Sequence, residues 1–345
     1  MTVFVGLSGG VDSLVSAWIL KNDGYDVVGI HAILVKELEE SILGKIKDVL
    51  GIEILKVDLR KEFEEKIIRF FIDEYSRGRT PNPCALCNKE IKFHLLMDFA
   101  MKMGADMFAT GHYVKLVRSN MGLILAKGRD EKKDQSYFLS LIERERLKNL
   151  IFPLGEYKKD DVVKMAEGIG FKVDELKSSK DLCFVHGNYR ELLERYGFTG
   201  KAGIFVDENG KILGRHDGIH RYTVGQRKGL KISAGKPLYV KRIDEDGTIT
   251  LVTKDGMFSK SFLVGEINWF MDVTYPVKCS CKVRYRTKEV DAVVERYDER
   301  FCKVSLMEPT FAITPGQISA FYDGDLLLGG AVIEEVLEDE EHTSR

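Results

Sequence analysis

The chain has 345 residues, 44% of them hydrophobic, and a formal net charge of −2 at pH 7, so it can bury the cores of two or three domains and is not a uniformly basic nucleic-acid binder. Six cysteines are too few for a secreted disulfide framework in a chain of this length. No apolar run approaches the roughly 18 residues of a membrane span, and residues 1–13 lack a signal-peptide pattern. We therefore expect a cytoplasmic protein without a membrane partner.

Predicted strands and helices alternate over the first 110 residues. Residues 3–7 form an apolar run typical of a buried strand, and residues 11–19 carry apolar side chains at helical spacing. A second apolar strand follows at 27–34. The pattern continues with a helix at 39–50, a strand at 52–57, helices at 61–75 and 91–102, and a strand at 107–110. Successive β-α-β units predict an α/β fold with a doubly wound parallel sheet.

The loop between the first strand and the first helix reads Leu-Ser-Gly-Gly-Val-Asp-Ser, residues 7–13. Its two glycines allow the backbone to approach an anion, and the helix N-terminus supplies oriented N–H groups. The loop lacks the Gly-Lys-Ser/Thr of a Walker loop, so it is better suited to holding pyrophosphate as a leaving group. A glycine-rich turn that only caps the helix is the structural alternative.

This loop resembles that of the ATP pyrophosphatases, enzymes with a PP-loop that split ATP into AMP and pyrophosphate while they adenylate a substrate oxygen. The resemblance implies that Asp12 acts near a magnesium ion. Gly111 is a further candidate because the backbone can approach the nucleotide there. The residues that we assign to ATP are Gly6, Leu7, Ser8, Gly9, Gly10, Val11, Asp12, Ser13, Ala32 and Gly111.

Cys84 and Cys87 form a C-x-x-C pair after the segment Thr-Pro-Asn-Pro. A zinc site of this type needs a second such pair or a histidine pair, and none follows at finger spacing. Cys183 lies about a hundred residues further on, in a polar loop that leads into an apolar segment. From spacing alone, a redox pair and a site completed by a third cysteine both stay open.

From about residue 200 the sequence changes character. Short alternating runs surround an Asn-Gly pair at 209–210 and an Asp-Gly pair at 246–247, which are hairpin signals. Residues 262–333 contain further short strands and little sign of helix. We predict a catalytic α/β domain at 1–199, a small β-rich central domain at 200–258 and a C-terminal β-barrel at 259–345.

Eight motifs, in family order over nearly the whole chain, resemble those of the tRNA-specific 2-thiouridylases, which place sulfur on C2 of the wobble uridine. They are GLSGGVDS, GRTPNP…CNKEIKF, ATGHYV, KDQSYFL, DLCFV, GRHDGIHRYTVGQRKGL, VRYR and TPGQ…YDGDLLLGGAVI. The resemblance implies that Cys87 is the catalytic nucleophile and that Cys183 carries the transferred sulfur. It also implies a tRNA-binding central domain followed by a β-barrel.

The chain departs from the family pattern in two places. The segment after residue 34 is abbreviated, and Cys84 stands where the family commonly has aspartate. The second departure leaves two mechanisms open. Cys84, Cys87 and Cys183 could ligate three irons of a [4Fe–4S] cluster and leave the fourth for a sulfide. Alternatively, Cys183 carries a persulfide that Cys87 attacks or resolves as a disulfide, with Cys84 a spectator.

Several segments are candidates for contact with tRNA. The motif at residues 132–139 mixes cations, amides and an aromatic ring, which suits phosphate contact and base stacking, although a solvated turn would look the same. Alternation in the motif at 283–288 would place Arg284 and Arg286 on one face of a strand. A flipped wobble uridine would lie near Asn82. The residues that we assign to tRNA are Asn82, Pro83, Cys84, Lys133, Asp134, Gln135, Arg284, Tyr285 and Arg286.

We therefore predict a tRNA 2-thiouridylase that uses ATP and Mg²⁺. Attack of the uridine O2 on the α-phosphate would release pyrophosphate, and sulfur from Cys183 and Cys87 would then displace AMP at C2. Its partners would be the anticodon stem-loop of tRNAs with a wobble uridine and a sulfur donor, such as a cysteine desulfurase or a relay protein. The alternatives are a PP-loop enzyme that thiolates or aminates another base or small molecule, and a non-catalytic RNA-binding protein with a retained nucleotide loop.

Overall fold

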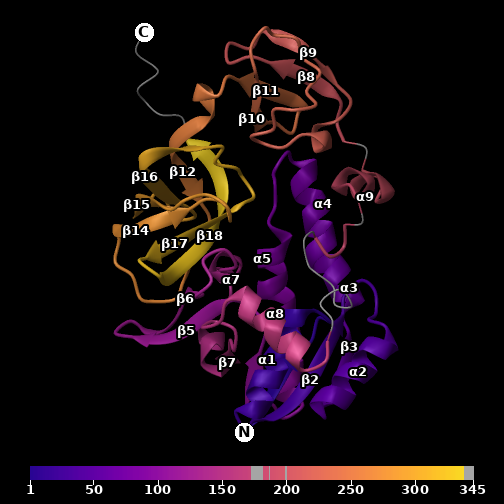
Figure 1. The fold of residues 1–345 in the computed structure, drawn as a ribbon. Helices are drawn as coiled ribbons and strands as arrows, with labels where there is room; N and C mark the ends of the chain where they lie inside the picture. Colours follow the sequence, from indigo (N-terminus) through magenta and orange to yellow (C-terminus); the bar gives the residue numbers. More distant parts are fainter. Residues whose placement is uncertain (172–181, 186, 199, 338–345) are drawn as a thin grey trace.

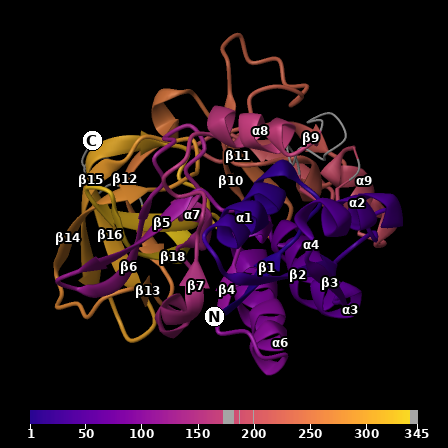
Figure 2. The same cartoon turned by 60° about the horizontal axis from the view of Figure 1, so that its bottom comes forward.

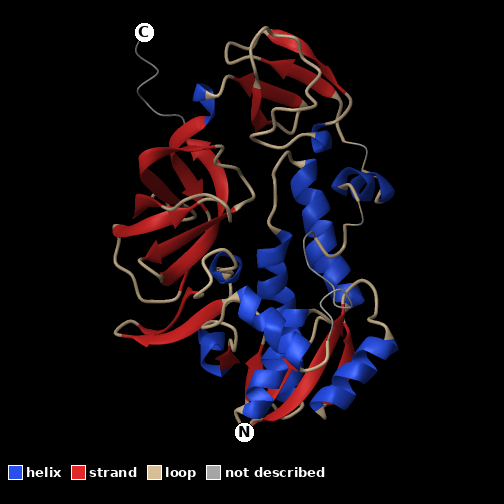
Figure 3. Cartoon of the chain, viewed as in Figure 1, coloured by secondary structure: helices blue, strands red, loops and turns tan. Residues whose placement is uncertain are grey.

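The computed structural model describes residues 1–171, 182–185, 187–198 and 200–337 (Figure 1). The N-terminal α/β domain lies at one end of the molecule, the central β domain at the other, and the C-terminal barrel beside them. Helices gather in the N-terminal domain and strands in the other two (Figure 3). The predicted order of an α/β domain, a β-rich domain and a barrel is confirmed.

The N-terminal sheet has five parallel strands in the order β3-β2-β1-β4-β7. Their bounds are Thr2–Gly6 for β1, Asp26–Ile33 for β2, Glu53–Asp58 for β3, Met107–Ala109 for β4 and Leu150–Ile151 for β7. The chain moves outward from β1 to β3 and then returns to β4 on the other side of β1. This reversal places a topological switch point between β1 and β4, where doubly wound folds bind ligands at the carboxyl ends of the strands.

Helices cover both faces of this sheet because successive residues of β1, which point to opposite faces, are apolar. Val3 and Val5 pack with α1 (Val11–Asn22), α2 (Glu40–Leu50) and α8 (Lys159–Gly168). Phe4 packs on the opposite face with the helices of residues 60–76 and 83–102 (Figure 2). None of the helices in the described ranges combines the length and the apolar character needed to cross a membrane.

Both long helices on the second face contain a π-helical segment. The first consists of α3 (Arg60–Phe63), η1 (Glu64–Ile68) and α4 (Arg69–Ser76). The second consists of α5 (Pro83–Cys87), η2 (Asn88–Leu96) and α6 (Met97–Lys102). Its predicted start at residue 91 is wrong: the cysteine pair already lies in the helix.

The physical reason is the N-terminal cap. The Asn82 side chain accepts a hydrogen bond from the Ala85 N–H at 3.1 Å, and Pro83 occupies the first helical turn. Both features favour a helix start, whereas the polar residues 88–90 hide the apolar periodicity. Cys84 and Cys87 are therefore held by a capped helix that continues into a π segment, a feature frequent at functional sites.

The two C-terminal domains are β structures. The central sheet runs in the order β10-β11-β8-β9, with β8 and β11 parallel. In the barrel, β12, β16, β15, β14, β17 and β18 follow one another, and pairing of β12 with β18 closes the ring. The bounds are β8 Gly203–Val206, β9 Ile212–His216, β10 Tyr239–Ile243, β11 Thr248–Val252, β12 Phe258–Val264, β13 Asn268–Trp269, β14 Val277–Lys282, β15 Val290–Arg296, β16 Cys302–Phe311, β17 Ile318–Asp323 and β18 Leu326–Leu337.

The shorter helices fill the connections: α7 spans Ser136–Leu139, η3 Arg144–Asn149, α9 Tyr189–Arg195, η5 Ile219–Arg221 and η6 Asp255–Met257. A hairpin of the N-terminal domain, β5 (Val114–Ser119) and β6 (Gly122–Lys127), extends the barrel sheet because β6 pairs with β18. The barrel is thus joined to the N-terminal domain through backbone hydrogen bonds, a connection that the sequence patterns did not indicate.

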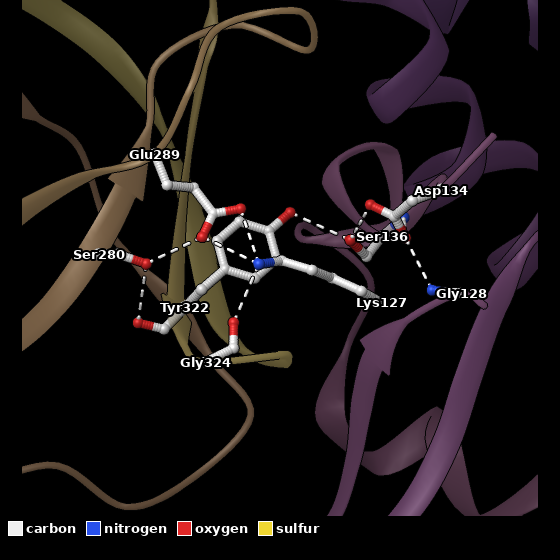
Figure 4. A network of polar contacts seen from close by, with 8 residues as sticks. All are labelled: Lys127, Gly128, Asp134, Ser136, Ser280, Glu289, Tyr322 and Gly324. Atoms are coloured by element: carbon white, nitrogen blue, oxygen red, sulfur yellow. Dashed lines mark hydrogen bonds and ion pairs between the residues drawn. The ribbon is translucent and has the colours of Figure 1, made fainter. Parts of the chain in front are cut away.

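A polar network reinforces this junction (Figure 4). The Lys127 ammonium donates to the carboxylate of Glu289 and to the carbonyl of Gly324, each at 2.9 Å. Ser136 donates to Asp134 at 2.8 Å, and its hydroxyl lies 3.1 Å from that of Tyr322 in the barrel. The motif of residues 132–139 therefore contributes directly to the contact between two domains.

Candidate active site

The loop between β1 and α1 is shaped by its own hydroxyl groups. Ser13 Oγ donates to the carbonyl of Gly10 at 3.0 Å and accepts the N–H of Ser8 at 3.2 Å. Gly9 has a φ of +77°, in the left-handed region that favours glycine. Leu38, in the abbreviated segment after β2, is buried against Gly9 and covers the loop from outside.

A cavity of about 220 Å³ opens beside this loop at the switch point of the sheet. Its wall combines apolar side chains, which suit an adenine ring, with hydroxyl, carboxylate and backbone groups near the loop. The lining residues are Gly6, Leu7, Ser8, Asp12, Ser13, Ile30, Ala32, Leu34, Lys92, Leu96, Phe108, Thr110, Gly111, His112 and Gln135. Ala32 and Gly111, assigned to ATP from the sequence, therefore line the same cavity as most of the loop.

Gly111 is a glycine for a packing reason. A Cβ atom there would lie 2.7 Å from the carbonyl carbon of Asp12 and 2.8 Å from the nitrogen of Ser13. His112 beside it is buried, its Nδ1 lies 2.8 Å from the hydroxyl of Thr110, and desolvation lowers its pKa well below the ordinary value. A neutral His112 thus forms part of the cavity wall.

Two side chains that the sequence analysis missed hold Asp12. Its Oδ1 accepts hydrogen bonds from the hydroxyl of Tyr113 and from the ammonium of Lys159, both at 2.6 Å. Burial, and then the charge of Asp12, raise the pKa of Tyr113 above its usual range. Lys159 begins α8, so it supplies near the loop the positive charge that the loop itself lacks. The only indication of such a residue in the sequence is that the loop of residues 7–13 lacks the lysine of a Walker loop.

The cavity fits a magnesium ion that arrives with the nucleotide. Asp12 is the one carboxylate among the lining residues described. Proteins commonly hold Mg²⁺ through one or two carboxylates together with substrate phosphates and water. Asp12 and the phosphates of ATP could supply such a set, with the Ser8 and Ser13 hydroxyls nearby.

The structure brings the three predicted site cysteines together. Cys87 is buried on α5, while Cys84 and Cys183 are exposed, and all three are free thiols. Desolvation, with smaller contributions from the neighbouring Cys183 and Cys84, raises the pKa of Cys87 to about 12. The pKa values of Cys84 and Cys183 are likewise raised, first by desolvation. The nearby Lys92 ammonium acts in the opposite direction on all three.

Aromatic packing holds Cys183 near the pair. The next residue, Phe184, is buried with its ring edge-to-face against Phe63 at 5.8 Å and Phe71 at 5.4 Å. Such pairs contribute about 0.5–1.5 kcal/mol beyond the burial of area. Phe184 therefore anchors the short described segment 182–185 to the helix formed by α3, η1 and α4.

The three cysteines do not form a ready metal site. In the ranges that the structure covers, no group of three or more His, Cys, Asp or Glu side chains is arranged to hold a metal ion. The ligand set of the cluster hypothesis is thus not preformed in this conformation, although its members are neighbours.

The loop before α5 is fastened to the barrel by the motif Thr-Pro-Gly-Gln of residues 314–317. The N–H of Thr80 donates to the carbonyl of Pro315 at 2.9 Å, and Gln317 Nε2 donates to the carbonyl of Thr80 at 2.9 Å. Arg79 lies 2.7 Å from Glu74 and 2.8 Å from Glu334 of β18. The barrel thus fixes the backbone that leads to the cysteine pair.

Residues assigned to tRNA fall into two groups near this site. Asn82 caps α5 and Pro83 is buried beside it, so both are placed close to the thiols. Gln135 lines the cavity and accepts the N–H of Tyr113 at 2.9 Å. Asp134 is 6% exposed and accepts the Gly128 N–H, so its contacts here are with the protein itself. Lys133 is exposed.

The second group lies after β14, where the predicted strand is wrong. Residues 284–286 form a turn in which the N–H of Thr287 donates to the carbonyl of Arg284 at 3.1 Å. Arg284 is half-buried and donates to Val224 of the central domain and to Thr314. Arg286 is exposed, and Tyr285 packs on Phe138 at 4.6 Å. Arg284 and Arg286 therefore do not share a strand face.

Three family descriptions match successive parts of the chain: a tRNA methyl transferase HUP domain over residues 1–187, a tRNA methyl transferase PRC-barrel domain over 190–254 and an aminomethyltransferase beta-barrel domain over 259–333. Curated proteins similar to the whole chain carry the name tRNA-specific 2-thiouridylase MnmA. The protein from Aquifex aeolicus is 42% identical over 356 residues, which cover 97% of this chain and 99% of the relative. That from Syntrophomonas wolfei is 41% identical over 339 residues, covering 96% and 100%.

Two solved structures resemble part of the chain. A predicted subunit of tRNA methyltransferase from Methanocaldococcus jannaschii is 21% identical with a TM-score of 0.37, over 57% of this chain and 88% of that one. A 4-thiouridine synthetase in complex with RNA and ATP is 20% identical with a TM-score of 0.35, over 56% and 50%.

Proposed function

Since the chain belongs to the family of tRNA-specific 2-thiouridylases, we propose that it binds ATP at the loop of residues 7–13 and uses it to place sulfur on C2 of the wobble uridine. Membership makes it a tRNA-uridine sulfurtransferase. The observation that carries the proposal is one continuous helix: η2 forms part of the cavity wall and follows directly on α5, which bears Cys84 and Cys87. Two of the matching domain families are named after tRNA methyl transfer. A nucleotide loop beside thiols instead fits activation of the uridine followed by sulfur transfer.

Activation comes first. The uridine O2 attacks the α-phosphate of ATP, pyrophosphate leaves, and C2 now carries AMP in place of a poor leaving oxygen. Oriented backbone N–H groups at the N-terminus of α1 would hold the phosphates, and Lys159 would balance their charge. Asp12 would hold Mg²⁺. The uridine would be flipped out of the anticodon loop towards Asn82, because C2 is inaccessible in a stacked base.

Sulfur transfer follows by the persulfide route. The Cys183 thiolate takes the outer sulfur of a persulfide on a donor protein, whose own thiolate leaves. The thiolate of Cys87 then attacks the inner sulfur of the Cys183 persulfide, which releases hydrosulfide and leaves a Cys87–Cys183 disulfide. Hydrosulfide displaces AMP from C2, and a dithiol reductant then restores both thiols. We favour this route over a [4Fe–4S] cluster because the three cysteines do not present a preformed ligand set.

The proposed units are the catalytic domain at 1–199, the tRNA-binding central domain at 200–258 and the barrel at 259–345. We also propose a cytoplasmic location, where tRNA and a cysteine desulfurase or sulfur relay protein would meet the enzyme.

One experiment tests the whole proposal. Purified protein with ATP, Mg²⁺, a sulfur source and tRNA that bears a wobble uridine is expected to release pyrophosphate only when tRNA is present, and digestion of the tRNA should yield 2-thiouridine by mass spectrometry. Sulfur on another nucleoside would identify a different PP-loop enzyme. Binding of tRNA with no pyrophosphate release under any condition would identify a non-catalytic RNA-binding protein.

The surface after β14 makes a separate prediction about RNA. We expect the Arg284→Gln, Arg286→Gln double variant to bind tRNA more weakly and to lower the slope of log affinity against log salt by about 0.7–0.9 for each lost phosphate contact. Arg286→Gln alone isolates the exposed side chain, since Arg284 also holds Val224. Arg300→Gln, an exposed barrel cation elsewhere, is the matched control. An unchanged slope in the double variant would place this turn off the RNA.

A further inference from the structure

Lys92 belongs both to the wall of the nucleotide cavity and to the surroundings of the three thiols. It lines the cavity together with Ser8, Asp12 and Gly111. It also lies close enough to Cys87 for its charge to act on that thiol. In a π-helix the hydrogen bonds run from residue i to i+5, so the residue five positions after Cys87 completes one turn of η2. The π segment thereby turns Lys92 towards the same side as Cys87.

The positive charge of Lys92 is not neutralised by the protein. Among the described residues, no hydrogen bond or ion pair engages its ammonium, and the side chain is half-buried. The neighbouring carboxylate on η2, Glu90, is occupied by Lys66 at 3.0 Å. An unpaired, half-buried ammonium that faces a ligand cavity is poised for an anion that arrives with the substrate.

The proposed reaction places negative charge in both of these surroundings of Lys92. On one side, the departing AMP carries a phosphate. On the other, the reactive forms of Cys87 and Cys183 are thiolates, and the burial of Cys87 disfavours its anion. The charged or titratable groups that act on Cys87 are Lys92, Cys183 and Cys84, and Lys92 is the one that favours its thiolate.

We propose that Lys92 is a catalytic residue of the sulfur-transfer step: its ammonium lies between the AMP phosphate of the activated uridine and the sulfur donors Cys87 and Cys183, and stabilises the negative charge on both. This inference rests on the proposed function. It assigns to the motif Cys-Asn-Lys-Glu-Ile-Lys-Phe a second reacting group besides its cysteine.

The first test needs neither tRNA nor ATP. Reduced full-length protein is treated with iodoacetamide at a series of pH values, and alkylation of each cysteine is followed by mass spectrometry of its peptide. In Lys92→Met we expect the midpoints of the curves of alkylation rate against pH to move to higher pH for Cys84 and Cys183. Both cysteines should then react about three- to tenfold more slowly near pH 8, because a shift of one pH unit changes the thiolate fraction about tenfold. Lys92→Arg keeps the positive charge and should show the wild-type midpoints.

Lys89→Met is the matched control, because Lys89 is a half-buried lysine on the same π segment and does not line the cavity. Cys279 in the barrel serves as an internal reference thiol. Thermal unfolding confirms that each variant is folded. Unchanged midpoints in folded Lys92→Met, or an equal rise in Lys89→Met, would overturn the proposal.

The second test is single-turnover thiolation with protein persulfidated beforehand. Pyrophosphate and 2-thiouridine are measured in the same reaction, and in Lys92→Met we expect the 2-thiouridine formed per pyrophosphate released to fall at least about tenfold and to recover partly in Lys92→Arg. Equal thiolation rates in Lys92→Met and wild type would contradict the proposal. Failure of the wild type to thiolate uridine would instead count against the proposed function, and the alkylation profile would still decide the role of Lys92 towards the thiols.

Discussion

A Cys183→Ser protein is expected to release pyrophosphate in the presence of tRNA and to form no 2-thiouridine. Cys183 is exposed on a segment that Phe184 anchors, and it lies beside Cys87, so it can receive sulfur from a partner and pass it inward. Loss of an essential nucleophile typically costs about a thousandfold or more. Cys87→Ser should show the same separation of the two half-reactions. Pyrophosphate assays and nucleoside mass spectrometry measure both.

Cys84 distinguishes the two sulfur chemistries. If a persulfide operates, Cys84→Ser keeps most of its activity and no iron copurifies. If a cluster forms after rearrangement, Cys84→Ser and Cys87→Ser lose iron and activity together, and Cys84→Asp retains part of both, because a carboxylate can also ligate iron. Full thiolation by iron-free Cys84→Ser protein, prepared and assayed without oxygen, would end the cluster hypothesis. Iron-dependent activity that vanishes in this variant would end the persulfide proposal.

The part of the candidate site that can be predicted from spacing alone is local. The apolar strand, the glycine-rich turn and the helix stripe of residues 2–22 are adjacent in the chain, so their spacing alone indicates both the fold and the phosphate loop. Gly111 and Ala32 are distant from this loop in sequence, and they line the same cavity because parallel strands of a doubly wound sheet end at one edge. Cys183 is grouped with Cys84 and Cys87 only through the family resemblance, since no local pattern connects residues so distant in sequence.

The features that the sequence analysis missed depend on contacts between distant segments. Lys159 reaches Asp12 only because α8 packs beside α1, and its charge-rich surroundings look like a solvated helix start. Alternating charges over residues 283–288 predict a strand because side chains of a strand alternate between two faces. The segment is too short for this pattern to distinguish a strand from a turn, which has no period of its own. Its backbone is instead turned by Thr287. The junction between the barrel motif and Thr80 likewise has no signal in either segment alone.

An Asp12→Ala protein is expected to lose tRNA-dependent pyrophosphate release by about a thousandfold or more while its affinity for tRNA changes less than about twofold. Asp12 is the lining carboxylate available to Mg²⁺, and it orients Lys159 and Tyr113 beside the loop. Removal of its charge therefore disturbs both the metal and the cation that would balance the phosphates. Pyrophosphate release is measured at saturating ATP, and tRNA binding by filter retention at fixed salt.

Matched variants separate the roles of Asp12. Asp12→Asn can still accept the hydrogen bond from Tyr113 but carries no charge, so a loss as large as in Asp12→Ala assigns the effect to the charge rather than to the shape of the loop. Lys159→Met should lower pyrophosphate release as well, whereas Lys158→Met, one residue earlier, should leave it near the wild-type rate. Because the substitution of Asp12 leaves a half-buried ammonium without its partner, a thermal unfolding midpoint accompanies each rate. Normal pyrophosphate release in folded Asp12→Ala would move the nucleotide site away from this loop.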